Sequence, residues 1–144
     1  MNKNLLIILS VCFTFAACLS CKKTTKSSVQ HDDIMGKWRR TRVAIDTNGN
    51  KKIDDLELLS PSSYDSTHVL VFNSDGSGLI TSSNVSVGTF SWSLENNNTY
   101  LRIDYAGSAT GTITQHIDTL SSSAMTLRDT TGVSVVWNLY TKQH

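Results

Sequence analysis

Apolar and polar residues alternate along much of the chain after residue 30. Every second residue is apolar within 90–94, 101–105 and 133–139. A period of two is typical of a β-strand with one buried face, and this part of the sequence lacks the 3.6-residue period of an amphipathic helix. The pattern predicts an all-β domain with eight strands, at residues 36–45, 68–73, 78–82, 87–94, 99–105, 111–119, 124–129 and 132–140.

The predicted strands are joined by turns rich in Gly, Asn, Asp and Ser, such as residues 74–78 and 95–98. Short turns join antiparallel neighbours. Eight such strands close a small up-and-down barrel, and closure leaves no unpaired strand edge. We therefore expect an eight-stranded antiparallel barrel. The alternative is a β-sandwich, in which the same strands fold over into two sheets.

The alternation also predicts which side chains fill the barrel. Bulky residues occupy positions that we assign to the inside, among them Phe90, Trp92, Leu94, Leu101, Ile103, Trp137 and Leu139. Such a set favours an interior filled by the protein's own side chains over an open cavity.

The direction of the arginines in the first predicted strand depends on where its alternation breaks. Strict alternation places Arg40 and Arg42 on the same side as Trp38, inside the barrel, where they would meet an anionic ligand. Val43 and Ile45 have the opposite parity, which requires a β-bulge. We predict a bulge after Trp38, which turns both arginines outward and Val43 inward.

The first residues have the pattern of an export signal. Lys3 precedes an uncharged, mainly apolar run at 5–17, which is short for a membrane span. We expect a signal peptide at 1–20, a polar flexible tether at 21–30, and one folded domain at 31–144.

The cysteines of the chain, Cys12, Cys18 and Cys21, all lie in this first segment. A bacterial lipoprotein signal ends in small residues directly before a cysteine that receives a lipid. Cys18 follows Phe-Ala-Ala, whereas Cys21 directly precedes the charged residues Lys22 and Lys23. Both remain candidates for lipidation, with palmitate among the acyl chains that we expect. The sequence thus predicts an exported protein anchored by lipid to the cell envelope, at the outer membrane, facing the periplasm or the cell surface.

Composition and spacing exclude several functions for the domain. The formal net charge of +1 argues against nucleic acid as a partner. Without cysteine after residue 21, the domain has neither a disulfide framework nor a cysteine-bound zinc. The four histidines, His31, His68, His116 and His144, lack the spacing of a zinc site and are predicted at the surface. The sequence shows no nucleophile elbow or phosphate-binding loop, so we do not expect an enzyme.

Gly36-Lys37-Trp38, at the start of the first predicted strand, resembles the Gly-X-Trp signature of lipocalins. Together with the lipoprotein signal and the eight strands, residues 31–142 are similar to small lipocalin-like lipoproteins of Gram-negative bacteria. The resemblance implies that Trp38 plugs the closed end of the barrel, with a basic side chain stacked on it. Arg128 and Lys142 are the candidates for that basic partner.

Residues 46–57 resemble an EF-hand calcium loop. The ligand positions carry Asp46, Asn48, Asn50, Lys52 through its carbonyl, Asp54 and Glu57. Calcium prefers such hard oxygen ligands. Lys51 stands where the loop normally has glycine, and no helix is predicted before the loop. The spacing predicts a structural calcium ion that orders the long connection from Asp46 to Thr67; the alternative is a solvated Asn48-Gly49 turn.

Two functions remain for such a barrel. The first, which we favour, is a membrane-anchored module that binds a small apolar ligand. The second is an accessory protein of the envelope whose core is closed by its own side chains and whose loops meet a protein partner.

Overall fold

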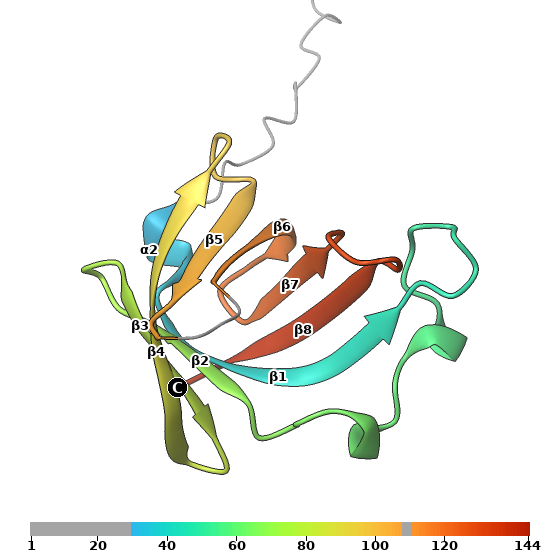
Figure 1. The fold of residues 1–144 in the computed structure, drawn as a ribbon, viewed down its shortest axis with the longest axis horizontal. Coiled ribbons are helices and arrows are strands. Elements are labelled where there is room, and N and C mark those ends of the chain that lie inside the picture. Colours follow the sequence, from blue (N-terminus) through green and yellow to red (C-terminus); the bar gives the residue numbers. More distant parts are fainter. Residues whose placement is uncertain (1–29, 108–110) are drawn as a thin grey trace, which may run out of the picture.

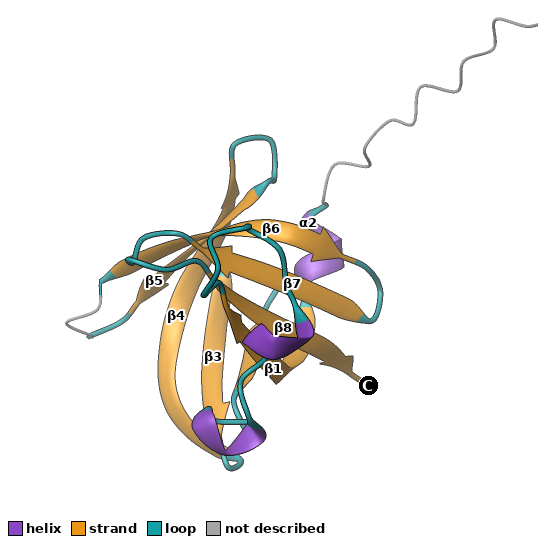
Figure 2. Ribbon diagram, turned by 90° about the vertical axis from the view of Figure 1, so that its right-hand side faces the viewer, coloured by secondary structure: helices purple, strands orange, loops and turns teal. Residues whose placement is uncertain are grey.

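Eight antiparallel strands form one closed barrel in the computed structural model, which describes residues 30–107 and 111–144. Each strand pairs with its neighbours in the sequence, and β1 pairs with β8 to close the barrel (Figures 1 and 2). The elements are α2 (His31–Ile34), β1 (Gly36–Ile45), η1 (Asp55–Glu57), η2 (Pro61–Ser63), β2 (Val69–Phe72), β3 (Ser77–Ser82), β4 (Val85–Glu95), β5 (Tyr100–Tyr105), β6 (Thr112–Leu120), β7 (Ala124–Asp129) and β8 (Val136–Gln143). The predicted barrel is confirmed, and the sandwich alternative is wrong.

The predicted and observed strands differ mainly at their ends. The bounds of β1 and β7 are those predicted, whereas β8 begins at Val136 and not at residue 132. Val133 is fully exposed in the β7–β8 loop. This loop begins with a local turn, because the Asp129 carboxylate accepts hydrogen bonds from the Thr131 N–H and hydroxyl, at 2.8 and 2.6 Å. The local turn therefore competes successfully with the apolar alternation.

One end of the barrel is packed solid. Its buried side chains come from α2 and from all strands except β3, and they form a continuous core: Ile34, Trp38, Leu70, Phe72, Phe90, Trp92, Leu101, Ile103, Ile117, Met125, Leu127 and Tyr140. The short helix α2 lies at this closed end, on the opposite side of the barrel from the β1–β2 connection (Figure 1).

Trp38 anchors the closed end. Its side chain is fully buried, and its Nε1–H donates a 2.6 Å hydrogen bond to the Ile34 carbonyl at the end of α2. The Lys142 ammonium lies 5.1 Å from the centre of the Trp38 ring, within range of a cation–π interaction. Gly36 has a φ of +116°, and a Cβ there would lie 2.9 Å from Cε of Lys142. Glycine at this position therefore permits both the backbone turn and the approach of Lys142.

β1 contains a bulge after Trp38, as predicted, but the bulge lies beyond Arg40. The register of β1 against β8 shifts between Arg40 and Arg42, so that Thr41 is the extra residue. Residues paired across a sheet face the same side, and Arg40 pairs with buried Tyr140. Arg40 therefore points into the barrel, and its predicted outward direction is wrong. Arg42, beyond the bulge, faces outward as predicted.

The same register reverses part of the predicted interior. Tyr140 pairs with buried Met125 on the inside, so Leu139 and Trp137 face outward. Their assignment to the interior was wrong. Trp137 is nevertheless only 2% exposed, and its Nε1–H donates to the Asp118 carboxylate at 2.9 Å. Trp137 is therefore buried, but on the outer face of the barrel and not in its interior.

Candidate functional site

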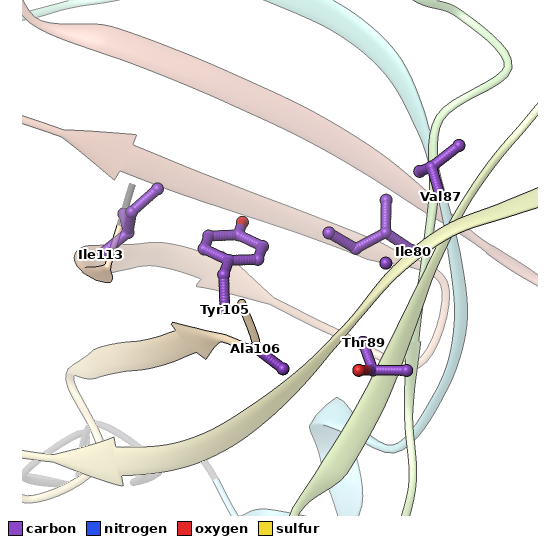
Figure 3. A pocket seen from close by; sticks show the side chains of 7 residues that line it. Ile80, Val87, Thr89, Tyr105, Ala106 and Ile113 are labelled. Atoms are coloured by element: carbon purple, nitrogen blue, oxygen red, sulfur yellow. The ribbon is translucent and has the colours of Figure 1, made fainter. Parts of the chain in front are cut away.

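A cavity of about 330 Å³ lies toward the end of the barrel opposite α2. Its lining residues come from β3, β4, β5, β6 and the turn after β5: Ile80, Val87, Gly88, Thr89, Tyr105, Ala106 and Ile113. Figure 3 shows the ring of Tyr105 between the side chains of Ile113 and Ile80. The wall is mainly apolar, and the volume falls at the lower end of the roughly 300–1,000 Å³ range of ligand pockets.

The floor of this cavity is the solid core. Ile80 and Tyr105 are both partly buried and pack against the core cluster. Gly88 pairs with Ile80 and faces the same side, and no other atom lies within 4 Å of the place where its Cβ would be. The missing side chain at Gly88 therefore contributes to the free space. The predicted interior filled by side chains is accurate for the closed end and wrong for this end.

Arg40 brings a positive charge to the interior beside the cavity. Its guanidinium donates two hydrogen bonds to the Asp65 carbonyl, at 3.0 and 3.3 Å, and lies 5.9 Å from the centre of the Tyr64 ring. Within the described residues, no carboxylate forms an ion pair with it. The β1–β2 connection thus holds Arg40 in place through a neutral backbone group and not through an ion pair.

The groups around Arg40 show the effect of burial and of this charge. Burial raises the pKa of the Tyr140 hydroxyl above its ordinary range, and the nearby Arg40 charge opposes that shift. The pKa of Tyr105 is raised for the same reason, again opposed by Arg40. Burial, aided by Arg40, lowers the pKa of His68 to about 4. The charge of Asp65 opposes this shift at His68, and a hydrogen bond from Thr67 lowers the pKa of the Asp65 carboxyl itself to about 2. At neutral pH the surroundings of Arg40 therefore include this carboxylate, two neutral phenols and a neutral imidazole.

Sequence reasoning missed most of this site. Tyr105 and Ile113 follow the alternation and were signals that it could have used. The inward direction of Arg40 depends on a one-residue difference in the position of the bulge. The alternation gives no signal at Gly88, because glycine has no side chain that could be classed as apolar or polar.

The predicted calcium ligands lie in the connection that follows β1. Asp46 and Glu57 are buried, at 7% and 4% exposure, and each is wrapped by backbone N–H groups of the loop. The amide nitrogens of Asn48 and Asn50 donate to the same Asp54 oxygen, at 3.0 and 2.6 Å. These bonds lower the pKa of the Asp54 carboxyl, with a smaller contribution from the charge of Lys52.

All five predicted ligands that act through a side chain are therefore held within the loop by local hydrogen bonds. Lys52, the sixth ligand, is held through its N–H, which donates to the Asn50 amide oxygen at 2.7 Å. In the described part of the chain, no three side chains of His, Cys, Asp or Glu form a metal cluster as they stand. A calcium loop draws on amide and backbone oxygens as well as on carboxylates.

The histidines differ in their surroundings. His31 is exposed and stacks on Trp92, with ring centroids 4.4 Å apart. His116 is partly buried and contacts the Asp118 carboxylate, 2.7 Å from Nδ1. His68, contrary to the surface prediction, is partly buried beside Arg40. His144 lies exposed at the end of the chain, as predicted.

The predicted signal peptide and the lipidation candidates Cys18 and Cys21 lie outside the described residues, as does most of the predicted tether. Across residues 30–107 and 111–144, no helix has the length and apolar character needed to cross a membrane.

Comparisons with known proteins bear on the fold. No protein-family model and no curated protein sequence matches the chain. Solved structures do match, among them two from Bacteroides. One is a lipocalin-like protein from Bacteroides uniformis, with a TM-score of 0.53 and 16% identity over 77% of this chain and 99% of that one. The other is an uncharacterized protein from Bacteroides eggerthii, with a TM-score of 0.53 and 14% identity over 76% of this chain and 98% of that one. The barrel is therefore similar in fold to a lipocalin-like protein of Bacteroides.

Proposed function

We propose that this protein is a binding module that holds a small apolar molecule with an acidic group in the open end of its barrel, while a lipid on Cys18 or Cys21 anchors it to the cell envelope. The observation that carries the proposal is the cavity of about 330 Å³ between Ile80, Tyr105 and Ile113, with the positive charge of Arg40 nearby.

The apolar wall favours binding of an apolar ligand but does not orient it. Ligand pockets of this kind combine apolar surface with a few polar groups that orient the ligand. Arg40 is suited to that role because a guanidinium binds a carboxylate through two parallel hydrogen bonds. A carboxylate would also suit the neutral phenols of Tyr105 and Tyr140, since a phenol can donate a hydrogen bond to it.

Exposed apolar residues lie on the strand ends and loops at this end of the barrel. Val85 and Val87, on β4 beside the cavity, are 64% and 60% exposed. Leu56 in the β1–β2 connection and Val133 in the β7–β8 loop are fully exposed. These two loops and the β3–β4 turn lie at the end of the barrel opposite α2. Such a rim favours the partition of an apolar molecule from a membrane surface into the cavity.

The test uses octanoate, with octanol as the uncharged probe of equal chain length, in isothermal titration calorimetry. We expect octanoate to bind more tightly. Arg40→Met keeps the apolar stem and removes the charge, and should weaken octanoate about tenfold or more, because hydrogen bonds to charged groups contribute about 1.5–3 kcal/mol. Octanol binding should be unchanged by this variant.

A second variant tests the cavity itself. Gly88→Leu places a side chain in the free space beside Ile80 and should abolish binding of both probes. Ser93→Leu is the matched control, because Ser93 is an exposed residue of the same strand that faces outward. If neither probe binds the unmodified protein, or if Gly88→Leu binds both as well as the control does, the proposal is wrong and the closed accessory protein becomes the better hypothesis.

A further inference from the structure

We propose that residues 46–57, the first part of the β1–β2 connection, bind one calcium ion through the carboxylates of Asp46, Asp54 and Glu57, the amide oxygens of Asn48 and Asn50, and the backbone carbonyl of Lys52. This site is separate from the barrel cavity and does not depend on the proposed ligand.

The strongest indication is the carboxylate of Glu57. The residue is 96% buried, yet its Oε2 has no hydrogen-bond partner in the described structure. The sister oxygen, Oε1, accepts the N–H groups of Thr47 and Asn48, at 2.8 and 3.3 Å, so the carboxylate is held against the start of the loop. An anionic oxygen that is buried and unpartnered is costly unless a cation or a donor reaches it.

Asp46 is the first residue of the same loop, and its carboxylate contacts the loop backbone. Its Oδ1 accepts the N–H of Gly49 at 2.6 Å, and its Oδ2 accepts the N–H of Lys51 at 3.0 Å. The chain from Asp46 to Lys51 therefore curls around this carboxylate. Asp46 is only 7% exposed, so the curl brings a second buried carboxylate to the loop that carries Glu57.

Lys51 is the residue that departs from the calcium-loop pattern, which has glycine at this position because the backbone turns sharply there. In this chain Lys51 adopts that turn without glycine, with a φ of +58°, in the left-handed region. Because the backbone has the conformation that the loop pattern requires, calcium binding requires no additional strain at Lys51. The one mismatch in the sequence is therefore no obstacle to the site.

The remaining oxygens lie on the same turn. The Asn48 side-chain oxygen accepts the N–H of Asn50, and the Asn50 oxygen accepts the N–H of Lys52, at 2.9 and 2.7 Å. Both amide nitrogens reach Asp54. Three carboxylates, two amides and one carbonyl supply the six or more hard oxygens that calcium requires, with three negative charges.

The ion would stabilise the connection that borders the barrel mouth. The loop is attached to the barrel by Asp46, whose N–H donates to the Val135 carbonyl, and by Leu59, whose N–H donates to the Val43 carbonyl, at 2.9 and 2.8 Å. Calcium between these attachments would join the two ends of the loop and neutralise its buried carboxylates. An ion that binds the folded state and not the unfolded state raises the melting temperature.

The experiment is a thermal melt of the intact protein, followed by far-ultraviolet circular dichroism, in 10 mM calcium, in 10 mM magnesium and in EGTA. With a dissociation constant of about 10⁻⁴–10⁻³ M, typical of extracellular calcium modules, calcium should raise the melting temperature by about 5–10 °C relative to EGTA. Magnesium should raise it much less, because it demands a small octahedral set of ligands.

Glu57→Gln tests whether Glu57 is a calcium ligand. It removes the charge of the carboxylate but preserves the size of the side chain and the oxygen that accepts the loop N–H groups. This variant should fold and should lose most of the calcium-dependent shift. Asp55→Asn is the matched control: it removes the same charge from an exposed neighbour outside the ligand set and should keep the shift. Equal melting temperatures of the unmodified protein in calcium and in EGTA would overturn the site, as would an undiminished shift in Glu57→Gln. An equal shift with magnesium would overturn its assignment to calcium.

Discussion

The contribution of Trp38 to the stability of the closed end can be measured by substitution. In Trp38→Phe an aromatic ring remains at this fully buried position, but the Nε1–H that donates to the Ile34 carbonyl is lost. Ile34 is itself fully buried, so its carbonyl would be left without this donor. The smaller ring also offers a weaker surface to the Lys142 ammonium, now 5.1 Å from the ring centre.

The expected loss follows from these contacts. A buried acceptor without its donor costs about 1–3 kcal/mol, and a cation–π contact contributes about 0.5–1 kcal/mol, of which phenylalanine retains a part. We expect Trp38→Phe to lower the free energy of unfolding by about 2–3 kcal/mol, with the unfilled volume of the larger ring adding to the loss. Lys142→Met keeps the apolar stem and should cost only about 0.5–1 kcal/mol.

Urea unfolding followed by far-ultraviolet circular dichroism measures both variants, because this signal does not depend on tryptophan emission. The double variant completes a cycle, and the coupling between Trp38 and Lys142 should be about 0.5 kcal/mol. A loss below about 1 kcal/mol in Trp38→Phe, or one no larger than in Lys142→Met, would show that the hydrogen bond to the Ile34 carbonyl does not hold the closed end.

Two further predictions concern stability. Folding lowers the pKa of His68 from an ordinary 6.5 to about 4. As the pH falls, the unfolded chain therefore binds a proton at this residue before the folded protein does. The free energy of unfolding should fall by about 1–2 kcal/mol between pH 6.5 and pH 4, after allowance for solvent screening. His68→Gln should flatten this loss relative to the exposed-site control His144→Gln, and equal slopes would refute the assignment. Gly78→Ala should cost about 1–3 kcal/mol, because its Cβ would lie 2.1 Å from the Phe90 ring. Gly88→Ala, with open space at its Cβ, should stay within about 0.5 kcal/mol of the unmodified protein, and equal urea midpoints for the two glycine variants would contradict this packing.

The alternation of side chains and the turn residues were sufficient to predict the eight strands and their antiparallel order, because both are properties of short segments. Residues 90–94 and 101–105 predicted their strands and their buried faces correctly, since no bulge interrupts either segment. The spacing of residues 46–57 was also sufficient to predict a polar loop, because its hydrogen bonds join residues at most ten positions apart along the chain.

The contents of the barrel were decided by the tertiary structure. The side on which Arg40 lies depends on whether the bulge falls at Thr41 or earlier, and that position is set by the register of β1 against β8, a strand about a hundred residues away. The same register turns Trp137 outward and Tyr140 inward. Local sequence determines the period of a strand, but only closure of the barrel determines its phase, because a shift of one residue exchanges the two faces.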